Sequence, residues 1–235
     1  MKHNNEIDYK LLLAISAMCI ALVSLTLLAV KAHAEPRLPG IPVSVVVVAS
    51  AESIGVANAT RFIDDAFNRM ASGRSLGIRL YRAKTIEAAP TYGVGALDSS
   101  SRAKALNSYV ADHCKSLGVE RGLMLFVTGP IISGGLRYSA GQANGIGNFG
   151  SKCAAALVNI KCENGCDART SAMAVTAVMH ETGHNLGAWH DEFSGRTMDP
   201  DALRAASIAL QPLRYSALSI AAIKQRVAKV LGGRL

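Results

Sequence analysis

The sequence HETGHNLGAWHD, residues 180–191, is the most informative stretch of this chain. His180 and His184 are four positions apart, so on a helix their imidazoles share one face and can reach one metal ion. Glu181 directly follows the first histidine, which predicts a carboxylate close to a metal-bound water but outside the ligand set. The stretch therefore predicts a helix that carries two metal ligands and a general base.

A glycine and a third histidine extend the pattern to H-E-x-x-H-x-x-G-x-x-H. Gly187 can take the positive φ that ends a helix and turns the chain back. The turn then brings His190 toward the other two histidines from outside the helix. Three neutral imidazoles leave the fourth position of zinc open for water, as in catalytic zinc sites. We expect one zinc ion per chain, bound by these three histidines.

This pattern resembles that of the metzincin zinc endopeptidases, and Asp191 after the third histidine makes it most similar to their adamalysin (reprolysin) branch. The resemblance implies that Met198, in the sequence RTMDP, forms an apolar floor beneath the imidazoles without binding the metal. Residues 215–219, YSALS, resemble the F-S-x-x-S that opens the last helix of adamalysin-like domains. We expect Asp191 to orient the loop of His190 or to cap a turn rather than to react.

The resemblance also implies the fold, an α/β (α+β) domain with a twisted mixed five-stranded sheet. An antiparallel edge strand, two long helices, an active-site helix and a small C-terminal subdomain would complete it. The upper part would span residues 35–187 and the lower subdomain 188–235. An extended protein or peptide substrate would add to the edge strand by main-chain hydrogen bonds. Residues 136–143 are the candidate for that strand.

Hydrophobic patterns predict the same order of elements. Strands are expected at residues 42–49, 77–86, 122–127, 136–143 and 154–160. Helices are expected at residues 56–70, 99–117 and 216–231, and the active-site helix from between 167 and 171 to near 187. Residues 199–210 are expected to form a loop with at most a helical turn.

Three departures from the metzincin families limit the resemblance. Pro200 stands where astacin-like and serralysin-like members have a tyrosine, so no oxyanion role is assigned there. Residues 35–113 contain no cysteine, which excludes latency through a cysteine switch. Too few residues separate the targeting segment from the first expected strand for a folded prodomain.

Residues 1–34 are expected to be a targeting segment rather than part of the fold. Residues 11–30 form an uncharged, mainly apolar run, and Ala32-His33-Ala34 has the form of a signal-peptidase site. Cleavage after Ala34 or an uncleaved N-terminal membrane anchor would both place the domain outside the cytoplasm. We therefore expect a secreted, periplasmic or extracellular protein, with membrane contact only through this segment.

The remaining residues, 35–235, suit one catalytic domain. Without three basic and two acidic residues of the first 34, the 25 Lys and Arg and 17 Asp and Glu become 22 and 15. The basic residues are scattered, so no nucleic-acid partner is expected, and the chain is expected to be a monomer.

Four cysteines follow residue 34, an even number that suggests two disulfides in an exported domain. We favour Cys162 with Cys166 and Cys114 with Cys153, although other pairings and a zinc-binding cluster are alternatives.

These patterns together predict a secreted zinc metalloendopeptidase with Glu181 as the catalytic residue. A cell-wall peptide hydrolase and an inactive zinc-stabilised binding protein are the alternatives. Retention of Glu181 disfavours the inactive protein, because a purely structural metal site does not require it. The sequence assigns no role to Trp189 or His113.

Overall fold

The computed structural model describes residues 16, 18, 40–48, 55–72, 76, 78–88, 108, 122–128, 132, 133, 137, 138, 141–143, 145–150, 154–159, 166–192 and 195–232. The chain divides into two units, Met1–Arg37 and Leu38–Leu235, and the fold is that of the second unit. The predicted helix at residues 99–117 and the apolar run at 11–30 lie almost wholly outside the described residues. Among the described residues, no helix is both long enough and apolar enough to cross a membrane.

A five-stranded mixed sheet is the base of the domain, with the order β2-β1-β3-β7-β6. β1 pairs in parallel with β2 and β3, β3 pairs in parallel with β7, and β6 is antiparallel to β7. The strands are β1 (Gly40–Val48), β2 (Arg79–Ala88), β3 (Leu123–Thr128), β6 (Gly141–Ala143) and β7 (Ala154–Asn159). In β1, Val43, Ser44 and Val45 are all buried, as expected of a central strand covered on both faces.

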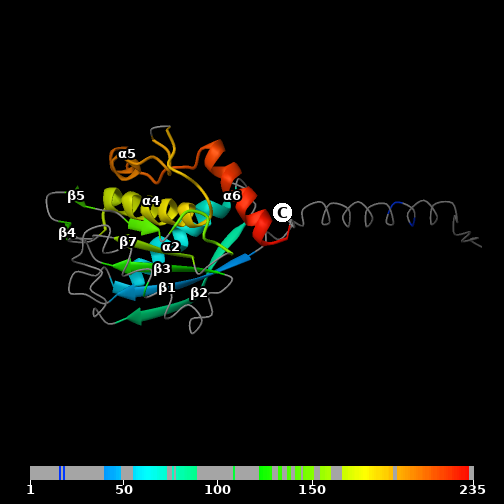
Figure 1. Ribbon diagram of the computed structural model, residues 1–235, viewed down its shortest axis with the longest axis horizontal. Coiled ribbons are helices and arrows are strands. Elements are labelled where there is room, and N and C mark those ends of the chain that lie inside the picture. The colour runs from blue at the N-terminus through cyan, green and yellow to red at the C-terminus, as the bar shows by residue number, and fades with distance from the viewer. Residues whose placement is uncertain are drawn as a thin grey trace, which may run out of the picture. The chain divides into compact units, whose positions relative to one another are not determined.

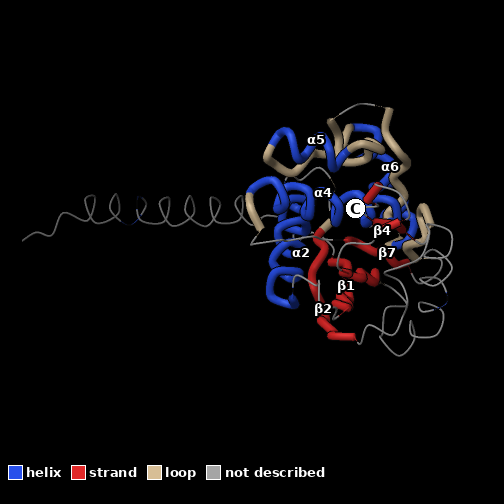
Figure 2. Tube along the Cα trace, turned by 90° about the vertical axis from the view of Figure 1, so that its left-hand side faces the viewer, coloured by secondary structure: helices blue, strands red, loops and turns tan. Residues whose placement is uncertain are grey.

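Two long helices pack beside each other against the sheet, as Figures 1 and 2 show. α2 (Gly55–Ser72) contacts β1 and β2, and its apolar residues form one buried stripe. That stripe contains Phe62, Ile63, Ala66, Phe67 and Met70. α4 (Ala168–Asn185) contacts β6, β7 and α2, and nearly every residue from Ala174 to Asn185 is buried. This helix carries the HETGHN sequence through the centre of the domain.

The chain after α4 contains α5 (Ala202–Ala209) and α6 (Ala217–Val230). α5 lies on the side of α4 away from the sheet, and α6 slopes past one end of α4 (Figure 1). α5 corrects our expectation of a loop with at most one helical turn. Alanines, which have the highest helix propensity, occupy half of its positions, and Ala202 and Ala206 are buried where α5 packs on α4.

The predicted strand at residues 136–143 is two separate strands in the structure. β5 (Arg137–Tyr138) pairs with β4 (Ile132–Ser133) in a two-stranded ribbon, and only β6 joins the main sheet. β6 begins at Gly141, and a glycine inside a run has no side chain to pack and weakens a continuous strand. The antiparallel pairing with β7 is therefore three residues long, from Gly141 opposite Val158 to Ala143 opposite Ala156.

Candidate metal centre

The helix that carries the first two histidines is fixed at its N-terminus by a side-chain cap. The carboxylate of Asp167 accepts a hydrogen bond from the backbone N–H of Thr170 at 2.7 Å. This bond satisfies one of the N–H groups that a helix leaves unpaired, and it lowers the pKa of Asp167. α4 therefore begins at Ala168, within the predicted range.

The three histidines of the motif meet at one point. The nitrogens that could bind a metal, one from each of His180, His184 and His190, all lie within 4.8 Å of one another. The ring centroids are 4.8 Å apart for His180 and His184, 5.3 Å for His180 and His190, and 4.8 Å for His184 and His190. His184 is buried, His180 is half-buried and His190 is exposed, so the site opens to solvent on the side of the third histidine.

Backbone carbonyls orient the two helical histidines as ligands. The Nδ1 atom of His180 lies 2.6 Å from the carbonyl oxygen of Thr197, and that of His184 lies 2.9 Å from the carbonyl oxygen of Ala188. A carbonyl only accepts, so each Nδ1 carries the ring proton and each Nε2 presents a lone pair. These two Nε2 atoms lie 3.2 Å apart, a close approach of two acceptors that a cation between them would stabilise.

Burial keeps the same imidazoles neutral. It lowers the pKa of His180 to about 4, with the nearby His184 adding to the effect. Burial also lowers the pKa of His184. A metal ligand must be unprotonated, so both side chains are in the required form at neutral pH. Three imidazoles without a carboxylate match the donor set of a zinc site with one open position.

Glu181, which follows His180 in α4, is buried. The residue is 6% exposed, and burial raises its pKa to about 8, although a hydrogen bond from the backbone N–H of Ala143 partly opposes the rise. Ala143 is the last residue of β6, so the carboxyl group lies where the edge strand meets α4. A carboxyl group with a pKa near neutrality can both take up and release a proton in that pH range.

The turn that leads to the third histidine has the predicted geometry. Gly187 has a φ of 107°, a left-handed conformation that glycine adopts without strain. The N–H of Gly187 donates to the carbonyl of His184, and that of Ala188 donates to Gly183. The chain therefore leaves the helix within one turn of His184 and returns with His190.

Met198 is fully buried against α4 at Gly183, a contact that the sequence analysis missed. A Cβ placed on Gly183 would lie 2.8 Å from the Sδ atom of Met198 and 3.0 Å from a ring carbon of Tyr215. The Tyr215 hydroxyl donates to the carbonyl of Met179. Gly183 lies between the two helical histidines in sequence, so the methionine turn packs directly beneath the part of the helix that carries them. A mid-helix glycine, which costs about 1 kcal/mol relative to alanine, was the available signal.

Asp191 is a structural connection between three segments. Its N–H donates to the carbonyl of Met198 at 2.8 Å, and its carboxylate accepts from the hydroxyl of Ser219 at 3.1 Å. Ser216 caps α6 by accepting from the N–H of Ser219 at 3.1 Å. The YSALS sequence thus starts α6 and provides the partner that holds the loop of His190.

Asp199 and Thr197 complete the loop, and neither was predicted. Both oxygens of Asp199 accept backbone hydrogen bonds, from the N–H of Gly195 at 2.7 Å and from that of Asp201 at 2.8 Å. Thr197 provides the carbonyl for His180 and is itself held by the carbonyl of Arg214. The D-P-D sequence is typical of such side-chain turns and was the available signal for Asp199.

The other predicted residues are outside this group. Cys166 is partly buried beside the core, while Cys114, Cys153 and Cys162 lie outside the described residues, so the disulfide pairings stay predictions. His113 also lies outside the described residues. Trp189, between the turn and the third histidine, is 70% exposed.

No family model matches this sequence, and no curated protein matches it. Solved structures do match in fold. Archaemetzincin from Methanopyrus kandleri is 15% identical over 82% of this chain and 98% of its own, with a TM-score of 0.56. Metalloproteinase-II from Bacteroides fragilis is 15% identical over 81% of this chain, with a TM-score of 0.58, and this chain spans about half of it (54%). A zinc-dependent peptidase from Methanocorpusculum labreanum is 13% identical over 77% of this chain and 99% of its own, with a TM-score of 0.50. The chain therefore shares the fold of these proteins, and its place in the adamalysin branch stays a prediction.

Proposed function

We propose that this chain is a zinc-dependent peptidase that hydrolyses peptide bonds, with His180, His184 and His190 as ligands and Glu181 as general base. The observation that carries the proposal is the convergence of three imidazoles, two of them oriented by backbone carbonyls and carried by a helix whose Glu181 carboxyl group is buried. The solved structures of similar fold, described as a metalloproteinase and a zinc-dependent peptidase, support the same chemistry.

The chemistry divides between the metal and the protein. Bound zinc would supply a Lewis acid that polarises the substrate carbonyl and lowers the pKa of water. Glu181 would take the proton from the attacking water and deliver it to the leaving amine. Burial raises the pKa of this carboxyl group in the metal-free chain, and a bound cation would lower it again toward the ionised form that accepts the proton. A metal site that only stabilised the fold would not require this buried carboxyl group.

The edge strand β6 indicates where an extended substrate would bind. β6 is the last strand in the sheet order and contacts α4, and its Ala143 N–H reaches Glu181. An extended peptide that paired with the edge of β6 that faces away from β7 would pass beside the general base. We infer cleavage within peptide chains on this basis, by a protein exported or anchored through residues 1–34.

A substitution of the general base tests the proposal. The purified protein, incubated with a mixed peptide library and zinc, should release new peptide termini that mass spectrometry identifies, and a zinc chelator should stop the release. Glu181→Gln should bind zinc as the wild type does and lose activity by about 10²–10⁴-fold or more. Undiminished turnover by this variant would refute the mechanism. Release of fragments from peptidoglycan but not from proteins would instead identify a cell-wall substrate.

A further inference from the structure

The last turn of α4 is capped by a loop that precedes it in the sequence by more than thirty residues. The carbonyl of His184 accepts a hydrogen bond from the N–H of Gly147 at 2.8 Å, and the carbonyl of Asn185 accepts from Phe149 at 3.1 Å. Carbonyls in the last turn of a helix have no partner within the helix. Residues 145–150, here called the capping loop, therefore hold the helix end at the second histidine ligand.

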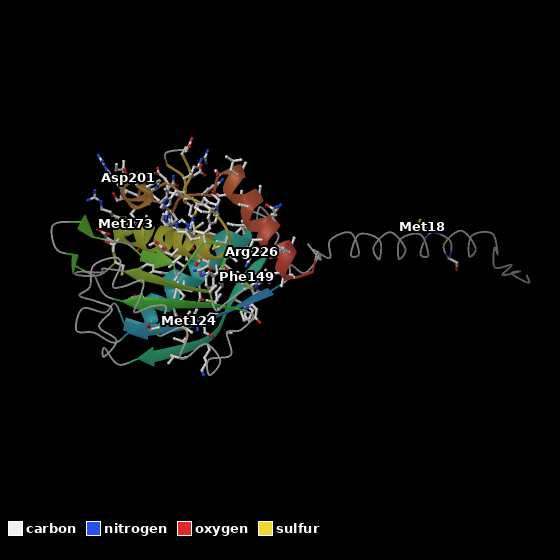
Figure 3. All side chains as sticks on the ribbon, in the orientation of Figure 1. Met18, Met124, Phe149, Met173, Asp201 and Arg226 are labelled. Atoms are coloured by element: carbon white, nitrogen blue, oxygen red, sulfur yellow. The ribbon has the colours of Figure 1, made fainter. Side chains whose placement is uncertain are left out.

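Arg226 of α6 holds the capping loop in turn. Its Nε atom donates to the carbonyl of Phe149 at 2.9 Å, and Figure 3 labels the two residues side by side. The Phe149 ring is fully buried, so this part of the loop is fixed by both polar and apolar contacts. The guanidinium also brings a positive charge toward the C-terminus of α4, where the helix dipole favours a cation.

The stem of the same arginine lies on the turn between the second and third ligands. A Cβ placed on Gly187 would lie 3.1 Å from the Cβ of Arg226 and 3.5 Å from its Cγ. Because Gly187 has no side chain, α6 can approach the turn this closely. Arg226 thus contacts the loop that caps α4 at His184 and also the turn that leads to His190.

We propose that Arg226 is a positioning residue of the metal centre. His180 and His184 belong to a rigid buried helix, whereas His190 is exposed and lies outside it. Ordering a loop costs conformational entropy, so a site whose third ligand is already held in place before the metal binds has a higher metal affinity. Arg226 acts through the backbone of the capping loop and of the turn at Gly187. This inference rests on the proposed function only in taking the three histidines as the metal ligands.

The test removes the hydrogen bond and keeps the stem. Arg226→Met should weaken Zn²⁺ binding by about tenfold, as measured by competition with a chromogenic chelator. This is the lower end of the effect usually seen when a residue that supports a metal ligand is replaced. Amide hydrogen exchange at Gly147 and Phe149 should become faster in the same variant. Arg226→Lys, which keeps a cationic donor on a flexible stem, should lose less affinity than the methionine variant. It also serves as the test if Arg226→Met does not fold.

Two substitutions on α6 control for general effects. Lys224→Met removes an exposed positive charge from the same helix and should leave zinc affinity unchanged. Val227→Ala destabilises the buried face of α6 next to Arg226, and at a temperature where it is fully folded it should bind zinc as the wild type does. The proposal is overturned if Arg226→Met binds zinc with wild-type affinity, or if Val227→Ala weakens zinc binding equally.

The outcome separates this inference from the proposed function. Peptide cleavage by Arg226→Met should fall at limiting zinc and recover when zinc is in excess, because only metal affinity is changed. If the wild type binds zinc but cleaves no peptide, the proposed function fails, and the affinity and exchange measurements still decide the role of Arg226. If the wild type cleaves peptides and Arg226→Met shows neither change, the role of Arg226 fails alone.

Discussion

The parts of the domain before and after Gly187 differ in how much buried hydrogen bonds add to apolar packing. Before the turn, stability comes mainly from apolar burial, since α2 and α4 cover the sheet with side chains such as Ile63 and Val178. After the turn, apolar residues such as Met198 are also buried, and buried polar residues link short segments through hydrogen bonds, as Asp191 and Asp199 do. The metal site lies at the junction, with two ligands on the rigid helix and the third on the hydrogen-bonded loop. Packing therefore controls whether the domain folds, and polar contacts control whether the third ligand is in place.

The largest expected effect comes from removing a metal ligand that lies on the buried helix α4. Zinc at a thousand times its Kd should stabilise the wild type by about 4 kcal/mol, because it binds the folded chain and not the unfolded one. His184→Ala leaves two imidazoles and should lose nearly all of this gain, seen as the loss of the zinc-dependent rise in Tm. Wild type melted with a chelator is the matched control. A full zinc-dependent rise in the variant would contradict the ligand assignment.

The second effect concerns Met198, which packs against α4. Met198 is fully buried, and Met198→Ala should cost roughly 2–5 kcal/mol of stability through the cavity it leaves. Met198→Leu nearly conserves volume and should cost less than about 1.5 kcal/mol, with zinc binding and much of the activity retained. Denaturant unfolding and zinc titration of both variants measure this. Loss of zinc binding in the leucine variant but not in the alanine variant would show that volume does not control the site.

A pH-dependent effect follows from the burial of Glu181. Its pKa is raised from 4.5 to about 8 in the folded chain, so between these values the folded state keeps a proton that the unfolded chain releases. The folded state then binds more protons, and this contribution to stability falls as the pH rises from 4.5 to 8. Glu181→Gln does not titrate and should be the more stable protein at pH 8.5 by roughly 2–4 kcal/mol.

The comparison between pH 5 and pH 8.5 is made with a chelator present, because a bound cation would favour the ionised carboxyl group. The advantage of Glu181→Gln over wild type should be small at pH 5. An equal advantage at both values would mean that burial does not raise the pKa of this group.

The smallest expected effect comes from the hydrogen bond that joins the loop of His190 to α6. Asp191 and Ser219 share a buried hydrogen bond with a charged acceptor, and such bonds contribute about 1.5–3 kcal/mol. A double-mutant cycle with Asp191→Asn and Ser219→Ala should give a coupling energy of roughly 1–2 kcal/mol. Each single variant should weaken zinc binding more than an apolar substitution on α2 that lowers the folding stability by the same amount. If the effects of the two substitutions on stability are strictly additive, Asp191 does not link the loop to α6.

Local patterns explain which parts of this domain were predictable. The four-residue spacing of the histidines and the glycine after them lie within one helix and one turn, so their convergence could be derived from neighbouring residues. The helix from residue 216 was also predicted, from its hydrophobic periodicity and the YSALS sequence that opens it, and the structure adds that Ser216 is its cap. The strand at residues 136–143 was wrong in extent, because the division between β5 and β6 depends on strand pairing and not on local hydrophobicity.

The unpredicted parts of the site depend on contacts between distant segments. Thr197 and Ala188 orient the histidines through carbonyl oxygens, which every residue has, so no side-chain pattern marks them. Gly183 is explained only by Met198 and Tyr215, which follow it by 15 and 32 positions. Arg226 and Phe149 are 77 positions apart, and neither residue type signals the contact.

The exposed side chain of Trp189 gives this protein an optical property. It is the single tryptophan of the chain and directly precedes His190, so their Cα atoms are about 3.8 Å apart. Tryptophan emission from the whole protein therefore originates beside the third ligand. A coloured ion such as Cu²⁺ or Co²⁺ at the three histidines would quench that emission by energy transfer, whereas colourless Zn²⁺ would compete and restore it. The chain thus contains its own fluorescent reporter of metal occupancy, and binding and release can be followed without a label.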